Sequence, residues 1–162
     1  MKSGAALRTA VACAIMIALH YTLRPLLGWR ASIDFLLIAL VFGSVRTRPA
    51  AAAVFGLFLG LAADSLSPGA FGAGALAATI VGFSSSWLKA VFFADNFALN
   101  AIFLFAGKWV FDFVFVLMAR QLRGLEILVQ LVLWTPLAAI ITAVAGVLVI
   151  TLLRPVYQER TA

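Results

Sequence analysis

Six apolar runs occupy nearly the whole chain, and this pattern constrains the fold more than any other feature. They extend approximately over residues 5–23, 33–45, 50–63, 70–88, 97–119 and 127–153. A helix needs about 20 apolar residues to cross a bilayer, and no polar stretch between the runs is long enough to fold outside the membrane. With 65% hydrophobic residues, 11% charged residues and a mean hydropathy of +1.13, the sequence predicts an all-α integral membrane protein. Residues 1–162 are expected to form a single transmembrane domain, a bundle of about six helices.

The second and third runs are shorter than a full span. They flank the basic turn Arg46-Thr47-Arg48-Pro49, whose proline suits the first position of a helix. Two tilted spans and a re-entrant hairpin both fit these lengths, and the basic turn favours two spans. The sixth run is long enough to tilt, and Pro136 is expected to kink it.

Basic residues lie singly or in pairs at the ends of the runs, where they act as topology signals. With the N-terminus inside, six spans place seven basic residues on the inner side: Lys2, Arg8, Arg46, Arg48, Lys89, Arg154 and Arg160. They place four on the outer side: Arg24, Arg30, Arg120 and Arg123. The distribution predicts a multi-pass protein with both termini in the cytoplasm. Although the net charge is +6, no basic stripe indicates nucleic acid as a partner.

The residues needed for common catalytic or metal sites are missing from the sequence. The chain has one cysteine, Cys13, and one histidine, His20, too few for a zinc site of the usual His/Cys type. No Ser-His-Asp triad, Walker loop or pair of catalytic carboxylates can be assembled. His20 stands beside Tyr21 near the end of the first run, where hydrogen bonding at the membrane interface is the expected role. The sequence therefore predicts no enzyme, no metal and no cofactor.

Lys108 and Asp112 lie four residues apart in the fifth run, and thus on one helical face near mid-membrane. A lone charge there costs at least about 2.5 kcal/mol, so the two are expected to neutralise each other inside the bundle. No intramembrane histidine or further acid is evident beside them, which favours a structural ion pair. A proton or ion relay, or a charge pair that binds a ligand, stays open. If the pair is isolated, replacing both residues by leucine should be tolerated.

Small residues recur at helical spacing in two runs. Gly56 and Gly60 share one face of the third run, and a stripe follows the first run through Ala6, Ala10, Ala14 and Ala18. Such stripes let helix backbones approach closely in membranes. Both are candidate packing faces.

Asp64 stands between two glycine-rich apolar runs, in the stretch GLFLGLAADSLSPGAFGAG of residues 56–74. One interpretation is structural: the carboxylate caps the fourth helix beside the Ser67-Pro68-Gly69 turn. The other is functional: it binds a solute or a partner loop at the outer surface. The residue chemistry favours the cap.

The same region resembles the signature of the MreD family of rod shape-determining proteins. FGLFLGLAAD (residues 55–64), the Ser-Pro-Gly turn and GAFGAGALAATIVGFSSSWLK (residues 69–89) follow the order of that signature. Gly60 to Asp64 matches its Gly-Leu-x-x-Asp element, and Val81 to Phe83 its later turn. The residues assigned to partner binding or to the structural signature are Gly56, Gly60, Asp64, Pro68, Gly69, Gly72 and Gly82.

This resemblance implies a non-enzymatic scaffold subunit of the elongasome in the bacterial inner membrane. Such a subunit binds MreC and acts indirectly with MreB, RodA and a transpeptidase in lateral peptidoglycan synthesis and rod cell shape. Asp64 and its turn are then expected to hold the junction of the third and fourth helices or to engage MreC.

The alternative function is that of a substrate-binding subunit of a vitamin or solute transporter. MreD-like bundles are similar to the six-helix S-components of energy-coupling-factor transporters. S-components bring several polar and aromatic ligand contacts to an outer pocket. The outward loops of this chain are poor in such residues, which favours the scaffold.

Overall fold

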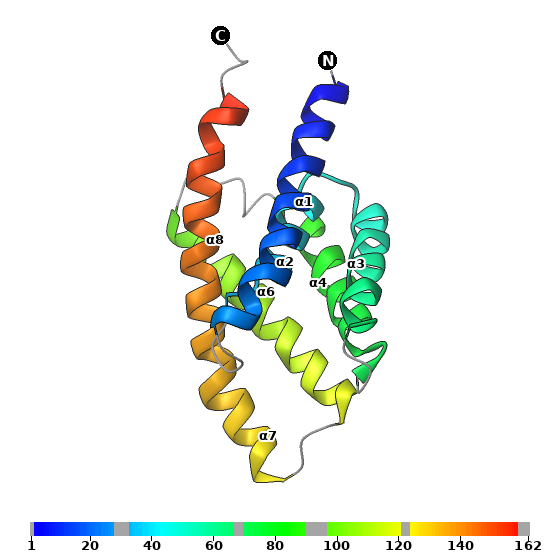
Figure 1. Ribbon diagram of the computed structural model, residues 1–162, viewed down its shortest axis with the longest axis vertical. Helices are drawn as coiled ribbons and strands as arrows, with labels where there is room; N and C mark the ends of the chain where they lie inside the picture. The colour runs from blue at the N-terminus through cyan, green and yellow to red at the C-terminus, as the bar shows by residue number, and fades with distance from the viewer. Residues whose placement is uncertain (1, 28–32, 67–69, 90–96, 121–123, 159–162) are drawn as a thin grey trace.

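The computed structural model describes residues 2–27, 33–66, 70–89, 97–120 and 124–158, and within these ranges it is helical and contains no strand (Figure 1). The helices are α1 (Lys2–Leu27), α2 (Phe35–Ser44), α3 (Pro49–Asp64), α4 (Ala73–Trp87), α6 (Phe97–Ala119), α7 (Leu125–Val129), the π-helical turn η2 (Gln130–Trp134) and α8 (Thr135–Gln158). Because α7, η2 and α8 follow one another without a break, the described chain forms six helical segments, one for each apolar run.

Helix α2 is the core of the bundle. All ten of its residues are buried, and it contacts α1, α3, α4, α6 and α8. A helix that is apolar on every side can be surrounded by other helices on every side. Ten residues rise about 15 Å, half of the roughly 30 Å hydrocarbon thickness. The second run therefore forms a short helix inside the protein, and it does not face lipid.

Helices α3 and α4 form a closely packed antiparallel pair along one side of the bundle (Figure 1). Pro49 occupies the start of α3, as the sequence predicts, and Arg48 before it has the extended backbone of an N-cap residue. The pair is joined at Ser65 to Gly72, a connection in which residues 67–69 lie outside the described part of the chain.

The two long apolar segments, α6 and the α7–η2–α8 rod, pack against each other on the other side. Both Phe97–Ala119 and Leu125–Leu152 are long and apolar enough to cross a membrane. The π-helical turn ends directly before Thr135-Pro136. Because proline lacks an N–H and clashes with the preceding turn, a widened turn at this point accommodates it within a continuous helix.

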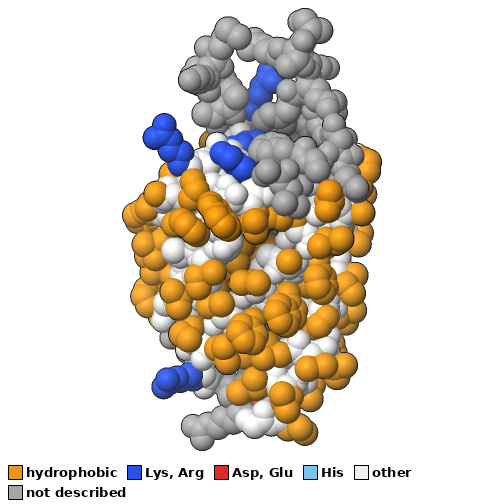
Figure 2. Space-filling view, turned by 180° about the vertical axis from the view of Figure 1, so that it is seen from behind, with side chains coloured by type: hydrophobic (Ala, Val, Ile, Leu, Met, Phe, Trp, Pro, Cys, Tyr) orange, Lys and Arg blue, Asp and Glu red, His pale blue; other side chains and the backbone are white. Residues whose placement is uncertain are grey.

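The bundle has two distinct ends. The N-terminal end of α1, the C-terminal end of α8 and the α2–α3 turn with Arg46 and Arg48 lie at one, the basic end. The C-terminal ends of α3 and α6, the N-terminal end of α4 and the short helix α7 lie toward the other, the junction end. In Figure 2 most visible Lys and Arg side chains gather at the basic end, and apolar side chains cover the surface between the ends.

Candidate functional site

The signature glycines bring the backbones of α3 and α4 into direct contact. A Cβ atom on Gly60 would lie 2.6 Å from the carbonyl oxygen of Gly74 and 2.7 Å from the nitrogen of Ala75. A Cβ atom on Gly56 would clash with the carbonyl group of Ala78. These neighbours are backbone atoms, which cannot rotate away as a side chain can. Only glycine therefore allows the two helices to approach this closely at both positions.

Asp64, the last residue of α3, caps α4 from the neighbouring helix. Its Oδ2 accepts hydrogen bonds from the N–H groups of Gly72, at 2.8 Å, and Ala75, at 3.0 Å. Its Oδ1 accepts one from the N–H group of Gly74, at 3.2 Å. The first N–H groups of a helix have no partner within it, and a carboxylate suits them because they carry a partial positive charge. The side chain is buried, with 2% exposure, so its oxygens face the protein.

The other signature residues shape the same junction. Gly72 has φ +92°, a left-handed conformation that favours glycine, and it directs the chain into the first turn of α4. A Cβ atom on Gly82 would lie 2.6 Å from the carbonyl oxygen of Ala52, so this glycine extends the α3–α4 contact toward the other end of the pair. Pro68 and Gly69 lie outside the described residues.

A second polar centre lies inside the bundle around Lys108, the midpoint of α6. The Lys108 Nζ donates to Asp112 Oδ1 at 2.6 Å and to Asp34 Oδ2 at 2.8 Å. All three side chains are largely buried, with side-chain exposures of 9% for Lys108, 17% for Asp112 and 12% for Asp34. The ammonium group therefore binds two carboxylates from different parts of the chain.

Asp34 ties four helices together. It is the N-cap residue of α2, and its Oδ1 accepts the N–H of Leu37 at 3.1 Å. Its own N–H donates to Thr142 Oγ1 on α8 at 3.2 Å. Together with the bond to Lys108 on α6 and the nearby His20 on α1, these contacts fix the start of α2 within the bundle.

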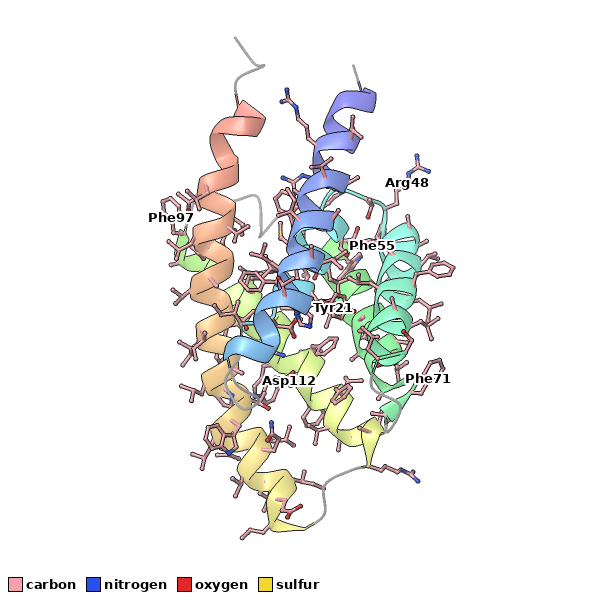
Figure 3. All side chains as sticks on the ribbon, viewed as in Figure 1. Tyr21, Arg48, Phe55, Phe71, Phe97 and Asp112 are labelled. Atoms are coloured by element: carbon pink, nitrogen blue, oxygen red, sulfur yellow. The ribbon has the colours of Figure 1, made fainter. Side chains whose placement is uncertain are left out.

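His20 completes this centre, which we call the ionic cluster: His20, Asp34, Lys108 and Asp112. Its Nδ1 accepts the N–H of Leu36 at 3.3 Å and lies 3.4 Å from Asp34 Oδ1. The ring is 5% exposed and meets Tyr21 edge to face. In Figure 3 Tyr21, the neighbour of His20 in the sequence, lies below Arg48 and above Phe71, in the middle part of the bundle.

Two expectations from the sequence are corrected here. Lys108 and Asp112 do form a pair, but the pair is not isolated, because Asp34 binds the same ammonium group. His20 does not lie on the surface of the protein, as an interfacial role would require, because its ring is buried inside the bundle, with 5% exposure, and α1 continues past it to Leu27. A histidine and a further acid therefore do lie beside the pair.

One feature of the sequence does indicate the role of Asp34. An aspartate three residues before a buried apolar position is a typical N-cap arrangement, and Asp34 stands three residues before Leu37. The pattern gives the start of the helix. It does not give the depth of that start in the bundle, which depends on tertiary packing.

The alanine stripe of α1 lies on the surface of the bundle. Ala10, Ala14 and Ala18 are exposed, whereas the side chain of Ala6 lies outside the described residues. The buried face of α1 consists instead of Ala12, Cys13, Met16 and His20. The stripe therefore does not make the contacts of α1 with α2.

Both centres fall within the region matched by one family model. The model described as rod shape-determining protein MreD matches residues 4–156. The chain belongs to the MreD family. Searches of curated proteins and of solved structures gave no match.

Membership in the MreD family supplies the general role. The family determines rod cell shape and consists of membrane proteins, and it is not known as a family of enzymes. In this chain the two buried polar centres link helices to one another: Asp64 joins α3 to α4, and Asp34 joins the start of α2 to α1, α6 and α8.

Proposed function

We propose that this MreD-family protein is a non-enzymatic scaffold subunit of the bacterial elongasome, which binds an MreC-like partner in the inner membrane. Through that partner it acts with MreB, RodA and a transpeptidase on lateral peptidoglycan synthesis. The proposal is supported by the family and by the construction of the α3–α4 junction.

The proposed topology places the basic end in the cytoplasm. Both ends of the chain's helical part, α1 and α8, reach the basic end, together with Arg46 and Arg48. Since basic residues are enriched on the cytoplasmic side, both termini are assigned to the cytoplasm. The junction end, with Asp64, then faces the periplasm.

The main support for the proposal is the α3–α4 junction, where apolar side chains are exposed next to the buried Asp64. The Asp64 oxygens are used within the protein, and the carboxylate is buried, so this residue supports a binding surface without forming it. Next to it Leu66 is 66% exposed and Phe71 is 67% exposed. Large aromatic side chains held on a fixed backbone are typical anchors of protein interfaces. We assign the junction rim, Leu66 and Phe71, as the contact for the MreC-like partner.

Co-purification from mild detergent tests this assignment. The chain and an MreC-like, single-span coiled-coil protein from the same host are co-expressed, and the partner recovered per mole of chain is measured. Phe71→Ala should lower recovery at least several-fold because it removes an exposed anchor without opening the core. The matched control is Phe97→Ala, since Phe97 is also an exposed phenylalanine, at 49%, and lies away from Phe71 (Figure 3).

Two results would contradict the proposal. If no MreC-like partner is recovered with the unmodified chain, even after mild crosslinking in the host, the scaffold function is refuted. If Phe71→Ala and Phe97→Ala recover equal amounts of partner, the scaffold stands and the junction rim is the wrong surface.

A further inference from the structure

Helix α2 begins inside the protein, and its first N–H groups need acceptors there. Water is excluded from the interior of a membrane bundle, so each such group has to be satisfied by the protein. The N–H of Leu37 is bound by Asp34 Oδ1 at 3.1 Å. The N–H of Leu36 is bound by Nδ1 of His20, which reaches it from α1 at 3.3 Å. The imidazole therefore serves as a cap for α2.

The same nitrogen has a second neighbour of opposite chemistry. Nδ1 of His20 lies 3.4 Å from Asp34 Oδ1, which is an acceptor. To accept the Leu36 N–H, Nδ1 must carry a lone pair, and the hydrogen of the neutral ring is then on Nε2. To bind Asp34, Nδ1 must carry a hydrogen. Nδ1 therefore accepts from Leu36 only when it carries no hydrogen, and it donates to Asp34 only when it carries one.

We propose that His20 is a reversible proton-binding site that exchanges one hydrogen bond of the α2 N-terminus for an ion pair with Asp34. In the neutral state Nδ1 accepts from Leu36. On acidification a hydronium ion of the aqueous phase gives its proton to the Nδ1 lone pair and becomes water, the ring becomes an imidazolium, and the new Nδ1–H donates to Asp34 Oδ1. The step forms one N–H bond and releases the Leu36 N–H, and no other reactant is needed.

The groups around His20 favour this exchange. Asp34 at the N-cap of α2 supplies the counter-charge, and Lys108 and Asp112 on α6 lie behind it through Asp34 Oδ2. On α1 itself Tyr21 contacts the ring edge to face. The residue that α8 contributes here is Thr142, which does not titrate and binds the Asp34 backbone. A histidine beside a carboxylate is the usual arrangement for a charge change near physiological pH.

The exchange has a structural consequence at one place. The Leu36 N–H loses its acceptor when Nδ1 is protonated, so the contact between α1 and the first turn of α2 is weakened while the ion pair is strengthened. Helix α2 contacts α3, α4, α6 and α8 as well as α1. A shift of its first turn therefore alters its packing against several helices at once. The proton site thus goes beyond partner binding at the junction rim and does not depend on it.

The single histidine of the chain makes the test direct. The full chain is labelled with ¹⁵N-histidine, placed in lipid nanodiscs and titrated by NMR between about pH 5 and pH 9, a range centred near the ordinary histidine pKa. We expect one imidazole with a hydrogen on Nε2 and none on Nδ1 at high pH, and a reversible change to the doubly protonated ring on acidification.

Asp34→Asn separates the proposal from an ordinary buried histidine. It keeps a side chain that can cap α2 and removes the counter-charge, so the titration midpoint should move to lower pH by about one unit or more. The control is Asp64→Asn, which makes the same change at the other capping carboxylate and should leave the midpoint unchanged. The unmodified chain overturns the proposal by itself if the neutral ring carries its hydrogen on Nδ1, or if the ring does not titrate in this range. An unchanged midpoint in Asp34→Asn overturns it as well.

Discussion

Removal of the Lys108 ammonium group is the sharpest test of the ionic cluster. Lys108 binds two carboxylates, at 2.6 Å and 2.8 Å, so Lys108→Met leaves both without their cation. A buried carboxylate escapes its charge by taking up a proton, which at pH 7 costs about 4 kcal/mol for an ordinary carboxyl group, at 1.36 kcal/mol for each pH unit. Breaking a buried pair typically costs about 3–5 kcal/mol. We therefore expect a loss of about 4–8 kcal/mol.

Second and third substitutions distinguish the cluster from an isolated pair. Lys108→Met with Asp112→Leu leaves Asp34 with His20 as its only neighbouring counter-charge among the described residues. Protonation of His20 would release the Leu36 N–H, so the double variant should remain destabilised by about 2–4 kcal/mol. Adding Asp34→Asn removes that last charge and keeps an N-cap side chain for α2. The triple variant should return to within about 2 kcal/mol of the unmodified chain, because apolar replacement of buried ions is often tolerated.

The assay is the free energy of unfolding in mixed detergent micelles containing increasing SDS, followed by circular dichroism at pH 7. If the single variant does not fold, the comparison of the double with the triple variant still decides. Full recovery in the double variant would refute the reasoning, because it would mean that Asp34 is neutralised without Lys108.

Further predictions concern the junction, the topology and the alternative function. Asp64→Ala should cost about 3 kcal/mol or more in unfolding free energy, because it leaves three N–H groups without their acceptor; equal stability would contradict the capping role. Gly60→Ala should cost about 2 kcal/mol or more by forcing α3 from α4, whereas Gly107→Ala, whose Cβ would lie 3.8 Å from its nearest neighbour, should be nearly neutral. The topology can be tested in a variant that lacks Cys13, with a maleimide that does not cross membranes. Ser65→Cys should react in cells whose outer membrane is permeabilised, and Thr47→Cys should react only after the inner membrane is also opened. The reverse pattern would contradict the proposed topology. The purified chain should show no thermal stabilisation by riboflavin, thiamine or biotin, and a shift of several degrees would favour the transporter subunit.

Much of the fold follows from the apolar runs, because helix length and apolar spacing are local properties. The expected range 97–119 coincides with α6, and the third run differs from α3 by one residue at each end. The spacing of Gly56 and Gly60 likewise indicates a face that in the structure meets the α4 backbone. The prediction that Asp64 caps the fourth helix is also local, because the first N–H groups of a helix need acceptors. The hydrogen bonds from Gly74 and Ala75 to Asp64 confirm it.

The ionic cluster is the part that the sequence did not reveal. Its members lie on α1, before α2 and on α6, and the bond from Lys108 to Asp34 joins residues 74 positions apart. Local spacing finds Lys108 with Asp112, because four residues make one helical turn. Asp34 and His20 enter through tertiary packing: α2 is short and starts inside the bundle, and α1 is longer than its apolar run. Both facts depend on contacts between residues far apart in the sequence, and no spacing rule encodes these.

The two carboxylates that cap helices, Asp64 and Asp34, differ in the groups that bind them. Asp64 is bound by three backbone N–H groups, which do not change their charge. Asp34 is bound by a lysine, a backbone N–H and a neighbouring histidine, and the histidine can change its charge. The Asp64 junction adjoins the rim, Leu66 and Phe71, that we propose as the contact for the partner. Any response of this protein to its surroundings should therefore originate at the start of α2, where the hydrogen bonds of the core depend on a proton.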